Sequence, residues 1–116
     1  MKVKTHVKDG IEIVEPCGKF LGGPDTGELD EKLYALLGRG VKGVVIDLGT
    51  TDWMNSSGLA ILLHHYRKFR DNGGDLVLAN LTKNIEKILV ISRLTTVFQT
   101  YESLDQAVAS FKGEKT

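Results

Sequence analysis

Two adjacent hydroxyl groups, those of Ser56 and Ser57, stand where a predicted strand gives way to a predicted helix, in the sequence Asn55-Ser56-Ser57-Gly58. The first N–H groups of a helix have no partner within the helix, and together with the helix dipole they attract anions. A phosphate on Ser56 would carry roughly −1.5 to −2 charges and offer three acceptor oxygens. A phosphate on Ser56 would therefore be tolerated without unfolding the domain, and it would change the surface that a partner meets.

The same residues also fit a purely structural role. Either Asn55 or Ser56 can be the N-cap, whose side-chain oxygen accepts a hydrogen bond from a backbone N–H group of the first turn. For a single serine at a helix start, capping is the more common role. Gly58 has no side chain, so we expect that the backbone of another protein can approach the serine closely.

The histidines and the cysteine form no recognisable site. His64 and His65 are adjacent, and neighbouring helix positions point about 100° apart, so we expect solvated side chains rather than a metal site. A reactive Cys17 would need a nearby base. His6 falls with the lysines on the outward face of its predicted strand, so we expect Cys17 to be a packed thiol.

The remaining polar segments also lack a catalytic pattern. The glycine-rich residues 18–23 are not followed by the Lys-Ser/Thr pair of a phosphate loop. Asp47 and Asp52 flank the serine-bearing turn, where solvated or capping carboxylates are at least as good an interpretation as an acid–base pair. We therefore expect no catalytic residue, no metal and no cofactor.

Strands and helices alternate around the serines. Residues 2–8 and 11–16 predict an antiparallel hairpin around Asp9-Gly10, the pair preferred in a type I′ turn, with Val3, Thr5 and Val7 on the inner face. Loops are expected over residues 18–27 and 49–54. The other predicted strands are residues 41–48, 75–79 and 95–98, and the predicted helices begin near residues 24–26, 56, 82 and 103. The order ββαβαβαβα predicts an α/β fold with a mixed sheet and helices packed on it.

The composition describes an ordinary globular domain. The chain has 116 residues, of which 41% are hydrophobic and 26% charged. It carries 15 basic and 15 acidic residues, a balance that argues against a nucleic-acid partner and against attraction to an anionic membrane. A single cysteine, no apolar leader and no long apolar run predict a cytoplasmic protein without direct membrane insertion.

The chain resembles the STAS family, the fold of bacterial anti-sigma factor antagonists and of the cytoplasmic tails of sulfate transporters. The similar segments are the strand at residues 44–48, the turn and helix start at 54–59, the strand entry at 73–78 and the C-terminal helix pattern. The resemblance covers nearly the whole chain. It implies a single STAS-like domain over residues 1–112, followed by a polar tail at 113–116.

In that family a serine at the matching helix start is phosphorylated by a serine kinase that is also the anti-sigma factor. The unphosphorylated antagonist binds the kinase and frees the sigma factor, and phosphorylation breaks the complex. Carried over, this implies that Ser56 accepts the phosphate, with Ser57 as the second choice. It also implies that an anti-sigma factor serine kinase is the partner and that a phosphatase is a further partner. The implied partner-binding residues are Gly18, Lys19, Leu21, Gly22, Asn55, Ser56, Ser57, Gly58 and Leu59.

The sequence departs from the family pattern at two positions. Asn55 replaces the aspartate that precedes the serine, so the capping oxygen is kept and the charge is lost. Leu21 stands where the family often has an aspartate. Two other functions therefore stay open: a STAS scaffold or soluble partner of a membrane transporter that is not phosphorylated, and a small enzyme or nucleotide-binding protein, which would need a convergent polar pocket.

Overall fold

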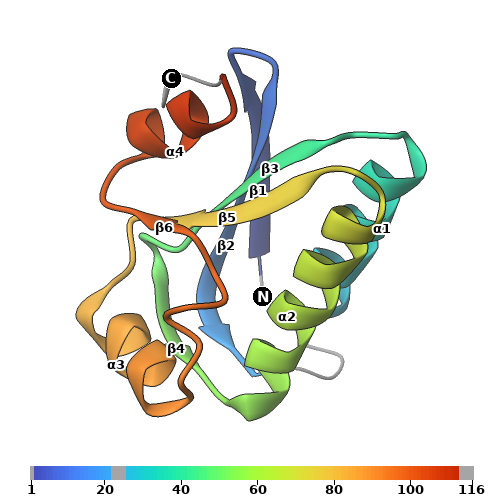
Figure 1. Ribbon diagram of the computed structural model, residues 1–116. Coiled ribbons are helices and arrows are strands. Elements are labelled where there is room, and N and C mark those ends of the chain that lie inside the picture. Colours follow the sequence, from blue (N-terminus) through green and yellow to red (C-terminus); the bar gives the residue numbers. More distant parts are fainter. Residues whose placement is uncertain (1, 22–25, 113–116) are drawn as a thin grey trace.

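The computed structural model describes residues 2–21 and 26–112, in which an N-terminal hairpin is followed by strands and helices in alternation (Figure 1). In chain order the elements are β1 (Lys2–Lys8), β2 (Ile11–Phe20), α1 (Gly27–Gly38), β3 (Gly43–Asp47), β4 (Thr51–Met54), α2 (Ser56–Asp71), β5 (Asp75–Ala79), α3 (Lys83–Ile91), β6 (Thr100–Tyr101) and α4 (Leu104–Ser110). None of these helices is both long enough and apolar enough to span a membrane.

The sheet is mixed, as the sequence predicts. Its strand order is β1-β2-β3-β5-β6, with β1 antiparallel to β2 and the later neighbours parallel. The β1–β2 turn is the expected one, since Asp9 and Gly10 both have positive φ, 53° and 80°. β4 lies off this path and pairs in parallel with the end of β2.

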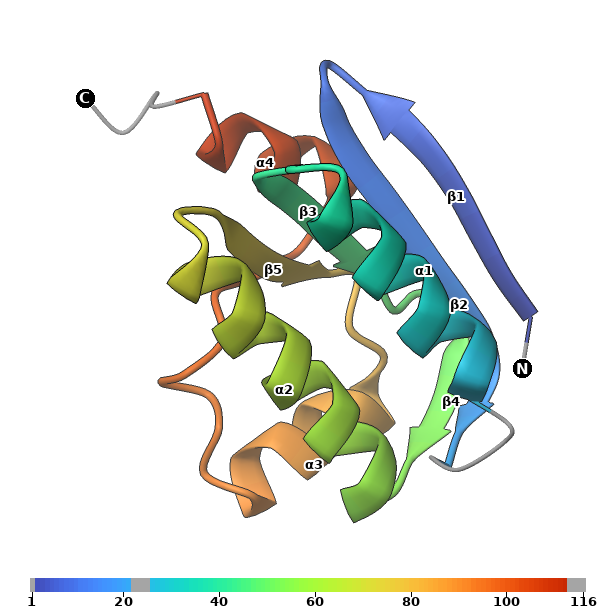
Figure 2. The ribbon, with the colours of Figure 1, turned by 90° about the vertical axis from the view of Figure 1, so that its right-hand side faces the viewer.

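The two faces of the sheet bury separate apolar clusters. Alternate residues of β3 and β5, such as Val44, Ile46 and Leu78, pack with the inner faces of α1 and α2. The residues between them, such as Val45 and Val77, pack beneath α4 on the opposite face. Figure 2 shows α1 and α2 running side by side along one face, with α4 set apart from them.

Two segments predicted as loops are strands. β2 continues through Phe20, and residues 51–54, expected to be a turn, form β4, so the order is ββαββαβαβα. These segments pair with each other, Gly18 with Thr51, Lys19 with Trp53 and Phe20 with Met54. Neither segment has a long apolar run of its own. Both are strands because they pair with residues far away in the sequence, which no local pattern reports.

Two further local predictions are wrong. Residues 95–98 form turns, and the last strand is Thr100–Tyr101. Phe98 is buried because its ring packs edge-on against Tyr66 of α2, with 5.2 Å between ring centroids. On β1 only Val3 of the expected inner face is buried, whereas Thr5 and Val7 are exposed on this edge strand.

Candidate functional site

The predicted phosphorylation site lies where β4 passes into α2. Met54, the last residue of β4, is buried and pairs with Phe20 at the end of β2. The backbone N–H of Asn55 then donates to the carbonyl oxygen of Phe20 at 3.2 Å. The backbone of β2 therefore fixes the point at which α2 begins.

Asn55 is the N-cap of α2, which decides between the two capping candidates. Its side-chain Oδ1 accepts a hydrogen bond from the Gly58 N–H at 2.9 Å. Ser56 and Ser57 occupy the first turn and are both exposed. In the described part of the chain neither serine hydroxyl has a hydrogen-bond partner, so both are available for chemistry that capping does not require.

Gly58 is required for internal packing. A Cβ built on Gly58 would lie 2.3 Å from the carbonyl oxygen of Phe20, far inside van der Waals contact. Gly58 is buried, and Leu59 is only 7% exposed within the main apolar cluster. Both residues therefore pack α2 against the rest of the fold, and binding of a partner by Gly58 and Leu59 stays a prediction.

The other predicted partner-binding residues lie around the end of β2. Lys19 and Leu21 are exposed, and half-buried Gly18 has φ of 101° and donates its N–H to the Thr50 carbonyl oxygen at 2.9 Å. Gly22 lies outside the described residues. Lys19 and Leu21 thus stand beside the strand that leads into Ser56.

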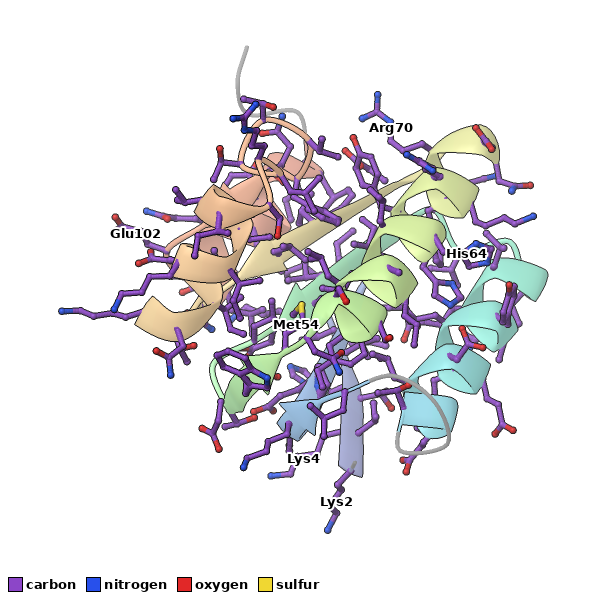
Figure 3. All side chains as sticks on the ribbon, turned by 90° about the horizontal axis from the view of Figure 1, so that it is seen from below. Lys2, Lys4, Met54, His64, Arg70 and Glu102 are labelled. Atoms are coloured by element: carbon purple, nitrogen blue, oxygen red, sulfur yellow. The ribbon has the colours of Figure 1, made fainter. Side chains whose placement is uncertain are left out.

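Trp53 is a surface residue that the sequence reasoning did not assign to the site. Its side chain is 46% exposed, and it pairs with Lys19 across β2 and β4. The segment carries no alternating signal, because Thr51 and Met54 are buried while the two residues between them are exposed. Figure 3 views this end of the molecule, with Met54 beneath the first turns of α2.

Of the two aspartates beside the site, Asp47 has a structural role for its carboxylate. Asp47 accepts hydrogen bonds at Oδ1 from the Gly49 N–H at 3.0 Å and from Asn80 Nδ2 at 3.1 Å, so it shapes the turn after β3. Asp52 is exposed, and its backbone carbonyl accepts from Asn84 Nδ2 at 3.4 Å. Among the described residues no group of histidine, cysteine or carboxylate side chains is arranged to hold a metal ion.

His65 differs from its prediction as a solvated side chain. It is fully buried, with Nε2 2.6 Å from Asp30 Oδ1 on α1, whereas His64 is exposed. The period of α2 places position 65 between Leu62 and Phe69, on the side that faces the rest of the fold. Cys17 is half-buried and 3.4 Å from the Thr50 hydroxyl, while the register places His6 opposite Ile13 and not opposite Cys17.

The family model of the STAS domain matches residues 2–107. The chain belongs to the STAS family. A Bordetella bronchiseptica protein named as an anti-sigma factor antagonist, BtrV, is 33% identical to this STAS domain over 112 residues, which are 97% of this chain and 96% of that protein. STAS domains of this type are binding modules and not enzymes.

Solved structures share the fold of this STAS domain at low identity. TM1081 of Thermotoga maritima, also named as an anti-sigma factor antagonist, superposes with a TM-score of 0.84 at 15% identity, covering 93% of this chain and 92% of that one. The unphosphorylated anti-sigma factor antagonist SpoIIAA gives a TM-score of 0.75 at 15% identity, with 97% and 99% covered. The phosphorylated form of Bacillus SpoIIAA gives 0.74 at 16% identity, with 95% and 99% covered.

Proposed function

We propose that this protein is an anti-sigma factor antagonist that binds an anti-sigma factor serine kinase through the surface around Ser56 and is released when Ser56 is phosphorylated. The observation that carries the proposal is that capping of α2 falls to Asn55 and leaves Ser56 without a capping role. Asn55 supplies the cap, and the adjacent Ser56 hydroxyl is exposed and unpaired among the described residues. Relatives named as anti-sigma factor antagonists, one of them solved in a phosphorylated form, support this function.

A phosphate on Ser56 would be compatible with the fold. The side chain points from the first turn of α2, where backbone N–H groups and the helix dipole favour negative charge. The modification would therefore leave the domain folded. It would also place roughly −1.5 to −2 charges beside the apolar side chains of Leu21 and Trp53, which a partner would have to desolvate.

The partner itself supplies the chemistry. The kinase would bring ATP and magnesium. The Ser56 oxygen would form a bond to the γ-phosphorus of ATP while the bond from that phosphorus to the bridging oxygen breaks, so that ADP leaves and the hydroxyl proton is released. A phosphatase would reverse the modification and restore binding. The STAS domain contributes a hydroxyl held at a fixed place on a folded surface.

The test is incubation with the cognate anti-sigma factor kinase and ATP, followed by mass mapping of the phosphate and by pull-down. We expect phosphate on Ser56, its loss in Ser56→Ala, and its retention in the matched control Ser57→Ala. We also expect Ser56→Asp to bind the kinase more weakly than the wild type. Phosphate on neither serine, or equal binding by Ser56→Asp, would contradict the switch.

A STAS scaffold without phosphorylation is the competing function, and Asn55 is the observation that favours it. The family's aspartate at this position would add a negative charge next to the hydroxyl, and Asn55 keeps only its capping oxygen. Stable kinase binding without phosphate transfer would favour this function. Copurification with a membrane transporter in place of a kinase would favour the transporter-associated form.

A further inference from the structure

The seam between α1 and α2 contains a buried titratable group that the proposed function does not use. The imidazole of His65 is fully buried there, and its Nε2 lies 2.6 Å from Asp30 Oδ1. One turn further along α1, the Tyr34 hydroxyl is hydrogen-bonded to His64 Nε2. Figure 3 shows His64 on the side of α2 that faces α1. The two helices are therefore joined by a pair of polar contacts, each including a histidine.

Only one of the two ring nitrogens of His65 has a partner that can accept a hydrogen bond from it. With His65 neutral, Nε2–H donates to the Asp30 carboxylate and Nδ1 carries a lone pair. Nδ1 is buried and has no hydrogen-bond partner among the described residues. A second proton at Nδ1 would create a charged donor without an acceptor, and burying such a group is unfavourable.

The other groups that face His65 do not remove this penalty. From α1 these are Asp30 and Tyr34, whose ring packs edge-on at 4.7 Å from the imidazole, and from α2 the neighbour is His64. Asp30 is the carboxylate that would favour the charged ring, but 42% of its side chain is exposed, so water screens it.

The sheet beneath α2 adds no compensating charge. β5 contributes buried apolar side chains such as Leu76 and Leu78, and its Asp75 lies 3.6 Å from Arg70 near the C-terminal end of α2. Burial accordingly lowers the pKa of His65, and the hydrogen bond and charge of Asp30 offset only part of that effect.

We propose that His65 is a proton-operated latch that holds α1 against α2 while it is neutral and releases α1 when it is protonated. In the closed seam the ring resists protonation, whereas in an opened seam it is solvated and has the ordinary pKa of about 6.5. The closed form is therefore fully favoured above about pH 6.5 and loses stability as the pH falls through the lower pKa of the buried ring. Each pKa unit by which the His65 ring of the closed seam differs from that of the opened seam changes the opening equilibrium about tenfold.

Amide hydrogen exchange tests the latch on the isolated protein, without any partner. The protection of α1, corrected for the intrinsic effect of pH, is compared with that of α3 in the same sample between about pH 7.5 and pH 5. We expect α1 to lose protection relative to α3 by about tenfold per unit of pKa difference. His65→Gln keeps a donor toward Asp30 but cannot titrate, so it should abolish the relative loss, while His64→Gln should retain it.

A second variant keeps the proposal testable if His65→Gln does not fold. Asp30→Asn removes the carboxylate that favours the charged ring, so an NMR titration should show a still lower pKa for the His65 ring, and the loss of α1 protection between about pH 7.5 and pH 5 should become larger. A purely structural role for the pair would weaken α1 equally at every pH. Relative protection of α1 that is independent of pH in the wild type, or a pH dependence that persists in His65→Gln, would overturn the latch.

Discussion

Gly58 lies so close to Phe20 that a side chain on Gly58 would overlap the Phe20 carbonyl oxygen, at 2.3 Å from an added Cβ. The same carbonyl accepts the N–H of Asn55. One peptide group at the end of β2 thus sets both the start of α2 and the closest approach of its first turn. The position of the Ser56 hydroxyl depends on this contact.

Gly58→Ala is expected to lower the free energy of unfolding by about 1–3 kcal/mol, because either α2 or the end of β2 must shift to admit the methyl group. Denaturant titration measures the change. Gly38→Ala is the matched control, since an added Cβ there meets no atom within 4 Å and the helix gains a better helix former. Equal stability of the Gly58 variant and the wild type would show that the contact relaxes without cost.

Asn55→Ala is expected to lower the free energy of unfolding by about 1 kcal/mol, because the Gly58 N–H loses its capping acceptor. Asn55→Asp should keep the cap and add a favourable negative charge at the helix start. Ser57→Ala, which removes an unpaired exposed hydroxyl, should stay within about 0.5 kcal/mol of the wild type. If Ser57→Ala lowered the free energy of unfolding as much as Asn55→Ala does, the assignment of Asn55 as the N-cap would be wrong.

Trp53→Ala is expected to weaken kinase binding about tenfold or more with little change in stability, because exposed tryptophans at interfaces often carry a large share of the affinity. This prediction depends on the proposed function. Calorimetry with the kinase gives the affinity. Val7→Ala is the control, since Val7 is 59% exposed and pairs with Glu12 near the start of β2, whereas Trp53 pairs with Lys19 near the end of that strand. Equal affinity of Trp53→Ala and Val7→Ala for the kinase would show that Trp53 is not part of the binding surface.

The stability of the whole domain should also depend on the protonation of His65. The pKa of His65 is lowered in the folded state by burial, so unfolding takes up a proton below the ordinary pKa of about 6.5. We expect the free energy of unfolding to fall as the pH drops from about 7 to 5. The decrease should be smaller in His65→Gln than in His64→Gln. Identical pH profiles for these two variants would show that other groups dominate.

Local patterns in the sequence were sufficient for much of the fold. Asp9-Gly10 predicts its turn from backbone preference alone. α3 and α4 begin where they were expected, with Thr82 and Ser103 as N-caps that each accept an N–H from the first turn. The β-branched run at residues 44–46 predicts a central strand, and β3 is indeed covered on both faces. In each case the deciding interaction joins residues near in sequence or follows from one segment's own composition.

The misses share a different origin. β4 exists because residues 51–54 pair with the end of β2, and Gly58 is buried because Phe20 lies against it. The burial of His65 follows from the packing of α1 against α2 and its pairing with Asp30. These contacts join segments about 30 or more residues apart, and no periodicity within either segment reports them. For the candidate site, the hydroxyl was predictable and its supporting contacts were not.

The pairing of β4 with β2 affects how such a domain can diverge. Backbone groups of β2, at Gly18 and Phe20, hold β4 and the start of α2 in place. Exposed side chains such as Lys19, Leu21 and Trp53 can therefore be exchanged without moving the hydroxyl of Ser56. A lineage of such proteins could change its choice of partner by surface substitution alone, while the backbone that positions the start of α2 stays the same.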